Sequence, residues 1–243
     1  MAFAIDLSRR TALVTGASRG IGRAIALALA ECGAAVVVNY RTRADEADAV
    51  VERIHAAGGR AIAVSADVSL GADVASLVER AARDLGPIDV LINNAGIALA
   101  DAGEETFDRT LAINLKSAYL MTEAILPGMQ ARRWGRIVNI SSVAARGAGA
   151  VGVAYNASKA GLEGLTRGYA ARVAKDGVTV NAIAPGPTDT EMAAPLKAAG
   201  VVARIPVGRM GAPEEVAQAM VLVIGNAFIT GQTIAMNGGL TFL

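Results

Sequence analysis

Tyr155 and Lys159 lie four positions apart, at the start of an apolar-periodic run that predicts a helix. Side chains with this spacing share one face of a helix, so the phenol and the ammonium can approach each other. An unperturbed phenol titrates near pH ~10, and a cation within roughly 4–6 Å lowers its pKa. The pair therefore predicts a tyrosine that exchanges a proton near neutral pH, as general acid–base catalysis requires. The alternative is a half-buried tyrosine with a solvated lysine one turn away.

A glycine-rich turn near the N-terminus predicts a nucleotide site. The β-rich run 11–15 leads into Gly16-Ala-Ser-Arg-Gly20-Ile-Gly22, and a helical pattern follows and stops at Gly33. Between a strand and a helix, glycines let the backbone approach a pyrophosphate, and the helix N-terminus offers unpaired N–H groups. The spacing is G-x-x-x-G-x-G, which differs from the G-x-G-x-x-G of the common dinucleotide fingerprint.

Three arginines predict which dinucleotide binds. About twenty residues after the glycine turn, NAD-binding folds usually place an acid that holds the ribose 2′-OH. That position holds Tyr40, followed by Arg41 and Arg43, and Arg19 lies inside the glycine turn. Guanidinium groups without an acid suit a 2′-phosphate, so we expect NADP(H). The alternative is three solvated arginines at the ends of their elements.

Strand and helix patterns alternate along the chain. Strand patterns occur at 11–15, 34–39, 61–65, 88–92, 135–142, 178–184 and 231–239, with helical patterns at about 44–57, 72–85, 104–129, 155–175 and from 213 onward. This order predicts an α/β fold: one Rossmann-like, doubly wound domain over 1–243, with a seven-stranded parallel sheet flanked by helices. Residues 188–211 show no strand pattern, and we expect an irregular, apolar substrate loop there.

Several polar residues fall where such a sheet binds its ligands, at the carboxyl ends of the strands. Asp67, Asn94 and Gly96 follow predicted strands, and the fifth strand delivers Ser142 to the same edge. Asn114 lies in an apolar helical stretch, where an unpaired buried amide is costly. It is either a satisfied structural amide or a polar group aimed at the site. For the residues at strand ends, the alternative role is turn formation.

The composition argues against several classes of function. The 243 residues are 53% apolar, and no apolar run approaches the ~20 residues of a membrane span. No basic n-region precedes an apolar stretch, so no secretory signal is expected. The lone cysteine, Cys32, excludes an internal disulfide, and the lone histidine, His55, argues against a histidine-based metal site or triad. A net charge of +1 leaves no footprint for nucleic acid. We therefore expect a cytoplasmic protein with no metal, membrane or nucleic-acid partner.

Taken together, the motifs resemble the short-chain dehydrogenase/reductase family. The matching segments are Thr15-Gly-Ala-Ser-Arg-Gly-Ile-Gly22, Asn93-Asn-Ala-Gly96, Ser142 with Tyr155 thirteen residues on, Lys159, Pro185-Gly186 with Thr188 and Thr190, Ile229-Thr-Gly-Gln and Asn237-Gly-Gly. They span nearly the whole chain, and each lies at the structural junction where the family has it.

The resemblance implies a role for each matching residue. Tyr155 would donate a proton to the carbonyl, Lys159 would lower its pKa and hold the nicotinamide ribose, and Ser142 would hydrogen-bond the substrate oxygen. Asn114 would anchor a water that relays protons to Lys159. Substrate contacts would come from Ser142, Val151, Gly152, Tyr155 and Met192. The cofactor would contact Gly16, Ser18, Arg19, Gly20, Ile21, Gly22, Arg41, Asp67, Val68, Asn94, Ala95, Gly96, Tyr155, Lys159, Pro185, Gly186, Thr188 and Thr190.

Within the family, the chain looks most similar to the 3-oxoacyl-acyl-carrier-protein reductases. This resemblance implies NADP(H)-dependent reduction of a 3-oxoacyl thioester to a secondary alcohol, with an acyl carrier protein as a candidate partner and a homotetrameric assembly. Arg133 matches a basic position that faces the carrier, whereas Asp176 and Gly152 depart from the basic residue and the glutamine common at their positions.

Two alternatives stay open. The first is a dehydrogenase or reductase of another small apolar ketone or secondary alcohol. The second is a nucleotide-binding regulator that has lost catalysis, since this fold also hosts such proteins. The complete set of Asn114, Ser142, Tyr155 and Lys159 argues against the second.

Overall fold

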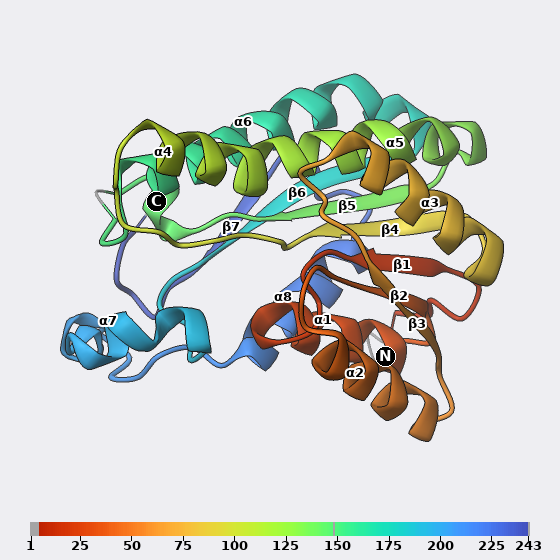
Figure 1. Ribbon diagram of the computed structural model, residues 1–243. Helices are drawn as coiled ribbons and strands as arrows, with labels where there is room; N and C mark the ends of the chain where they lie inside the picture. The colour runs from red at the N-terminus through yellow and green to blue at the C-terminus, as the bar shows by residue number, and fades with distance from the viewer. Residues whose placement is uncertain (1–4, 148, 243) are drawn as a thin grey trace.

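The computed structural model describes residues 5–147 and 149–242. Seven strands pair in parallel to form one sheet in the order β3-β2-β1-β4-β5-β6-β7 (Figure 1). The strands are β1 (Thr11–Val14), β2 (Ala35–Tyr40), β3 (Arg60–Ser65), β4 (Ile88–Asn93), β5 (Gly135–Ile140), β6 (Val178–Pro185) and β7 (Thr233–Met236). The chain winds outward in both directions from β1 and β4, which confirms the predicted doubly wound α/β class.

Both faces of the sheet are covered, which explains why its strands read as continuous apolar runs. Successive side chains of a strand point to opposite faces. Val14 of β1 and Val36 of β2 belong to one buried cluster, while Leu13 and Val37 belong to the other. Each cluster forms the core between the sheet and one helical layer.

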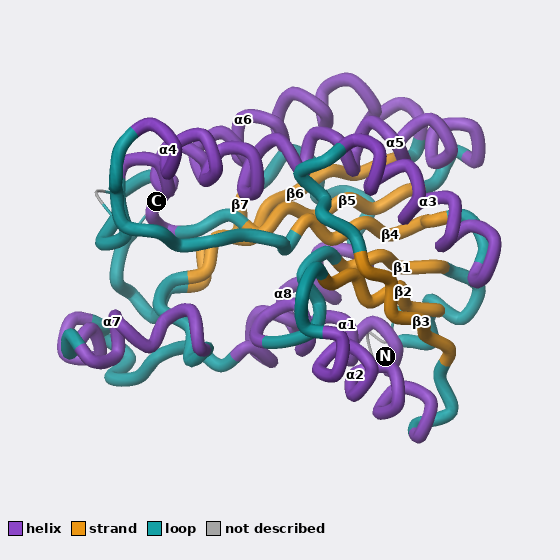
Figure 2. The backbone as a smooth tube through the Cα atoms, in the orientation of Figure 1, coloured by secondary structure: helices purple, strands orange, loops and turns teal. Residues whose placement is uncertain are grey.

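The helices form two layers (Figure 1). One layer holds α1 (Gly20–Glu31), α2 (Ala44–Ala56) and α8 (Pro213–Gly225), and the other holds α3 (Gly71–Leu85), α4 (Glu104–Leu111), α5 (Ser117–Arg132) and α6 (Val153–Val173). The loops after β4 and β6 extend toward the same end of the sheet as the small helix α7 (Ala194–Ala198) (Figure 2). In the described part of the chain, no helix combines the length and apolarity needed to cross a bilayer.

The long helix predicted at 104–129 is interrupted. Between α4 and α5 the chain makes a π-helical turn, Ala112–Lys116. A π turn holds one more residue than an α turn, so it changes the direction in which the following side chains point. Asn114 lies in the middle of this turn and is only 1% exposed.

The expectation of an irregular loop at 188–211 was wrong in part. Residues 188–211, called the substrate segment below after the role that the sequence predicts, contain the 3-10 turn Glu191–Ala193, helix α7 (Ala194–Ala198) and the 3-10 turn Val201–Arg204. Ala193, Ile205 and Met210 form a small buried cluster within it. Helical pieces of three to five residues hold too few apolar positions to produce a periodic signal, so the pattern missed them.

Candidate active site

A cavity of about 1420 Å³ opens at the carboxyl ends of the strands. Each residue named above as a cofactor contact lines it, from Gly16 of the glycine turn to Thr190 of the substrate segment. Ser142, Val151 and Met192 also line it. The sheet order reverses between β1 and β4, and ligands of doubly wound sheets bind at such a switch point. The fold therefore gathers these predicted residues around one space.

Tyr155 is the third residue of α6, in its first turn, and burial raises the pKa of its phenol. A hydrogen bond from Ser142 opposes this change. Ser142 is held by its own helical turn, where its Oγ accepts the backbone N–H of Ala144 at 3.2 Å. The sequence predicted a pKa lowered by Lys159, and the structure corrects this, because desolvation of the phenol outweighs the hydrogen bond from Ser142. At neutral pH Tyr155 therefore keeps its proton.

Lys159 is 4% exposed, and desolvation lowers its pKa to about 8. Its Nζ donates a hydrogen bond to the carbonyl of Ile140 at 2.8 Å, at the last residue of β5. The same nitrogen lies 5.7 Å from the centre of the Tyr155 ring, within the range of a cation–π contact. The two side chains thus lie close together on one face of the helix, as predicted. The Lys159 ammonium donates its hydrogen bond to the backbone of β5, however, and not to the phenol oxygen.

Asn114 faces the same region from the π turn without lining the cavity. Its Oδ1 accepts the N–H of Ile97 at 2.8 Å, and its Nδ2 donates to Ile97 O at 3.0 Å and to Ser158 Oγ at 3.1 Å. A Cβ added to Gly96 would lie 3.3 Å from Asn114 Oδ1 and 3.5 Å from Lys159 Nζ. The amide therefore joins the loop after β4 to α6, and Gly96 leaves little spare room beside Asn114 and Lys159.

Asp101, which the sequence patterns did not single out, holds the start of α6. Its carboxylate accepts the backbone N–H groups of Val153 at 2.8 Å and Ala154 at 3.3 Å. A Cβ added to Gly152 would lie 2.6 Å from Asp101 Oδ1, so this glycine makes room for the carboxylate. Gly152 does not line the cavity, in contrast to its predicted substrate contact. The cap is supplied from another loop, so no local pattern could reveal it.

The glycine turn is packed too tightly for larger residues. Gly16 has φ of +61°, a conformation that favours glycine. A Cβ added to Gly22 would lie 2.4 Å from Gly16 O and 2.5 Å from Asn94 Nδ2. Asn94 donates from Nδ2 to the carbonyls of Thr15 at 2.8 Å and Gly16 at 3.0 Å. Asn94 therefore ties β4 to the turn, and its side-chain amide orients backbone groups that line the cavity.

Asn39, which the sequence patterns did not single out, is a buried residue behind the glycine turn. It is 2% exposed at the end of β2, and its Oδ1 accepts the N–H of Gly16 at 3.3 Å. Its Nδ2 donates to Ala66 O at 3.2 Å. The only local signal is a polar residue at the end of an otherwise apolar strand.

The arginines predicted to bind a 2′-phosphate contact carboxylates in this structure. Arg41 Nη1 lies 3.4 Å from Asp67 Oδ2. Burial raises the pKa of Asp67, but hydrogen bonds from Ser69 and the charge of Arg41 outweigh it and leave the pKa lowered. Arg19 donates to Glu191 of the substrate segment, a contact that the sequence analysis did not anticipate.

The donor set fits a phosphorylated dinucleotide. Arg19, Arg41 and Arg43 line the cavity, as do Ser142 and Tyr155. Unpaired N–H groups at the start of α1 suit a pyrophosphate, and guanidinium groups suit a further phosphate. The volume of about 1420 Å³ exceeds the ~300–1,000 Å³ of an ordinary ligand pocket, which leaves room for a cofactor and a substrate.

Comparisons with known proteins agree with this arrangement. The family model described as short chain dehydrogenase matches residues 10–200. A 3-oxoacyl-[acyl-carrier-protein] reductase of Synechocystis sp. is 44% identical over 241 residues, which cover 96% of this chain and 98% of that protein. A protein of the same description from Pseudomonas aeruginosa is 41% identical over 246 residues, covering 97% and 99%.

Solved structures resemble the whole fold. A dehydrogenase/reductase from Sinorhizobium meliloti superposes with a TM-score of 0.91 at 36% identity, covering 99% of this chain and 98% of that one. A putative gluconate dehydrogenase from Agrobacterium tumefaciens superposes with a TM-score of 0.92 at 34% identity, and the match covers 99% of each chain. Since the family model matches residues 10–200 and relatives at 41–44% identity cover nearly the whole chain, the chain belongs to the short-chain dehydrogenases, oxidoreductases that act on CH–OH groups.

Proposed function

We propose that the chain reduces the ketone of a 3-oxoacyl thioester to a secondary alcohol with NADP(H). The observation that carries the proposal is one cavity bordered by a glycine turn with arginines and by Ser142, Tyr155 and Lys159. The relatives from Synechocystis and Pseudomonas aeruginosa, which are described as 3-oxoacyl-[acyl-carrier-protein] reductases, support this substrate class.

The cofactor would supply the hydride and the acceptor for its return. The glycine turn would hold the pyrophosphate, and Arg19 and Arg41 would hold the 2′-phosphate in place of their present carboxylates. Thr188 and Thr190 border the same cavity from the substrate segment and would fix the nicotinamide end.

Tyr155 would act as the proton donor. Because burial raises its pKa, the phenol is protonated at neutral pH and can give that proton to the oxygen of the reduced ketone. Ser142 would donate a hydrogen bond to the same oxygen and stabilise the negative charge that develops there. Lys159, whose pKa is lowered to about 8, would stabilise the phenolate and return a proton to it at little energetic cost.

The substrate wall also suits a small apolar ketone, which is the second candidate. Val151 and Met192 border the cavity, and no carrier is needed to reach them. Arg133, which would face an acyl carrier protein, lies before β5 and donates to Lys175 O at 2.9 Å. Six strand residues at ~3.3 Å each separate it from Ser142 by roughly 20 Å. A carrier that contacts Arg133 of the same chain would therefore have to deliver its thioester across roughly that distance.

A homotetramer, as the family resemblance implied, is part of this proposal. An apolar groove on α4, α5 and α6 is lined by Leu111, Leu115 and Leu165, with Tyr119 46% exposed beside it. Phe228 and Phe242 are 98% and 94% exposed near the C-terminus. Exposed apolar surface of this kind commonly marks contacts between subunits. Light scattering behind a sizing column would measure the assembly.

The test of function is a substrate comparison with purified protein. NADPH consumption is followed with an acetoacetyl-carrier-protein thioester, the matching coenzyme A thioester and small apolar ketones. A 3-oxoacyl thioester reductase should give its highest kcat/KM with a thioester. Turnover of small ketones alone would favour the second candidate, and no turnover of any ketone would contradict the reductase assignment.

A further inference from the structure

Glu191 joins the two sides of the cavity. It begins the 3-10 turn Glu191–Ala193 of the substrate segment, and its Oε2 accepts a hydrogen bond from Arg19 of the glycine turn. Arg43, from the loop before α2, donates through Nη1 to Glu46, and its Nη2 lies 3.5 Å from the same Glu191 oxygen. One carboxylate therefore connects the substrate segment to two loops on the cofactor side, 172 and 148 residues earlier in the chain.

These contacts occupy groups that a 2′-phosphate would use. Arg19 lies in the glycine turn, and Arg43 lies two residues after Arg41. The side chains of Arg19, Arg43 and Glu191 are 40%, 42% and 63% exposed, and ion pairs at such exposure are weak. A phosphate monoester carries roughly −1.5 to −2 charges at neutral pH and binds guanidinium forks bidentately. A phosphate can therefore take these arginines from the carboxylate, and it would then repel that carboxylate.

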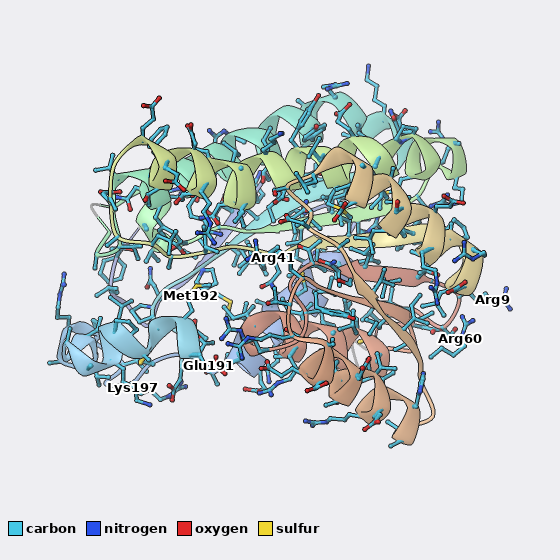
Figure 3. The ribbon with its side chains drawn as sticks, viewed as in Figure 1. Arg9, Arg41, Arg60, Glu191, Met192 and Lys197 are labelled. Atoms are coloured by element: carbon cyan, nitrogen blue, oxygen red, sulfur yellow. The ribbon has the colours of Figure 1, made fainter. Side chains whose placement is uncertain are left out.

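The position of Glu191 couples this exchange to the substrate side. Met192, the next residue, lines the cavity where the substrate would lie. Both side chains lie where the segment that carries α7 approaches α1 (Figure 3). A dinucleotide without a 2′-phosphate offers nothing that would displace Glu191, so the link to the glycine turn would persist.

We propose that Glu191 is a specificity-determining residue: it occupies Arg19 and Arg43 until a 2′-phosphate displaces it, and this displacement frees the start of the substrate segment. The inference rests on the proposed use of NADP(H). In this proposal Glu191, a residue of the substrate segment, contributes to the preference for a 2′-phosphorylated cofactor.

The first test is nucleotide binding, measured by calorimetry with adenosine 2′,5′-bisphosphate and 5′-AMP, which differ only in the 2′-phosphate. Glu191→Gln keeps the side-chain shape and removes the competing charge. Its affinity for the bisphosphate should rise ~3- to 10-fold over wild type, because two exposed ion pairs no longer oppose binding. Its affinity for 5′-AMP should change less than about twofold, since that ligand does not compete with the carboxylate.

Asp189→Asn is the matched control. It removes the same charge two residues earlier, but the Asp189 carboxylate contacts Lys197 Nζ at 2.9 and 3.0 Å rather than the two arginines. A general effect of net charge would raise bisphosphate affinity equally in both variants and would overturn the proposal. An effect confined to Glu191→Gln is the expected result.

Hydrogen exchange of the backbone amides provides a readout that needs no catalysis. In ligand-free protein, Glu191→Gln should speed exchange over residues 191–204, and the bisphosphate but not 5′-AMP should do so in wild type. If wild type prefers the bisphosphate while Glu191→Gln binds it no more tightly, the role of Glu191 is refuted and the cofactor assignment survives. If wild type binds both nucleotides equally, the NADP(H) assignment itself fails, and the proposal fails with it.

Discussion

Replacing Lys159 with methionine should stabilise the folded protein at neutral pH while abolishing its activity. The pKa of this buried lysine falls from 10.5 to about 8 because desolvation disfavours the ammonium. Each pKa unit corresponds to about 1.4 kcal/mol, so holding the charge in the folded protein costs about 3 kcal/mol at pH ~7. Methionine has a similar length and carries no charge, so it removes this penalty.

The variant also loses a favourable contact. The hydrogen bond from Lys159 Nζ to Ile140 O disappears, which costs about 1–2 kcal/mol. The net gain in the free energy of unfolding at pH ~7 is therefore about 1–2 kcal/mol. Turnover should be lost nonetheless, since no cation remains beside Tyr155. The comparison separates what the lysine does for stability from what it does for catalysis.

The pH dependence gives the sharper test, because the hydrogen-bond contribution largely cancels from it. Between the folded pKa of about 8 and the ordinary value of 10.5, the unfolded chain binds more protons at this lysine than the folded chain does. Wild-type stability therefore rises with pH in this window, relative to the variant. The charging penalty falls from about 3 kcal/mol at pH ~7 to about 1 kcal/mol at pH ~10.

The assay is urea unfolding of both proteins at the two pH values and at one protein concentration, since any assembly adds to the apparent stability. The advantage of Lys159→Met should shrink by about 2–3 kcal/mol between them. Lys175→Met, at an exposed position, is the control and should show no such change. The difference in the free energy of unfolding between wild type and Lys159→Met would be the same at both pH values only if Lys159 carried no desolvation penalty. Such a result would refute the claim that burial disfavours the charged form of this lysine.

Three further predictions follow from the same cavity. Tyr155→Phe removes the proton donor and should lower kcat by ~10²–10⁴, while the NADPH affinity measured by calorimetry should change little. A variant that keeps more than a tenth of wild-type turnover would contradict the assignment of Tyr155 as proton donor. Wild type should prefer NADPH over NADH by about tenfold or more in kcat/KM. The double variant Tyr40→Asp, Arg41→Ala should move that preference toward NADH. Equal use of both cofactors by wild type would show that Arg41 is only a surface charge. Asp101→Ala removes the cap of α6, so it should lower the free energy of unfolding by about 1 kcal/mol and should lower kcat several-fold. If neither quantity changes, α6 positions Tyr155 without this cap.

The sequence by itself determined the features that depend on neighbours in the chain. The buried parallel strands are largely continuous apolar runs, and the chain alternates them with helical patterns, so the fold class was predicted correctly. The glycine turn was visible because glycine alone tolerates its backbone conformation and its close packing at Gly22. Tyr155 and Lys159 were paired correctly because a spacing of four residues has one meaning on a helix.

The tertiary structure decided the features that depend on residues far apart in the chain. Asp101 meets the start of α6 from 52 residues away, and Glu191 meets Arg19 from 172 residues away. No local pattern encodes such contacts, because the fold brings together segments that have no sequence relationship. The short helices of the substrate segment were missed for a different reason, since they are too brief to show a period.

The direction of the Tyr155 pKa also required the structure. The sequence shows that a cation is near the phenol, and on that basis a lowered pKa was expected. Burial acts in the opposite direction on both groups: it raises the pKa of Tyr155 and lowers that of Lys159 to about 8. Desolvation depends on how densely the rest of the chain surrounds a group, which spacing cannot reveal. Residue types and spacing thus identified the acid–base pair, whereas packing set the direction in which the pKa of each member shifts.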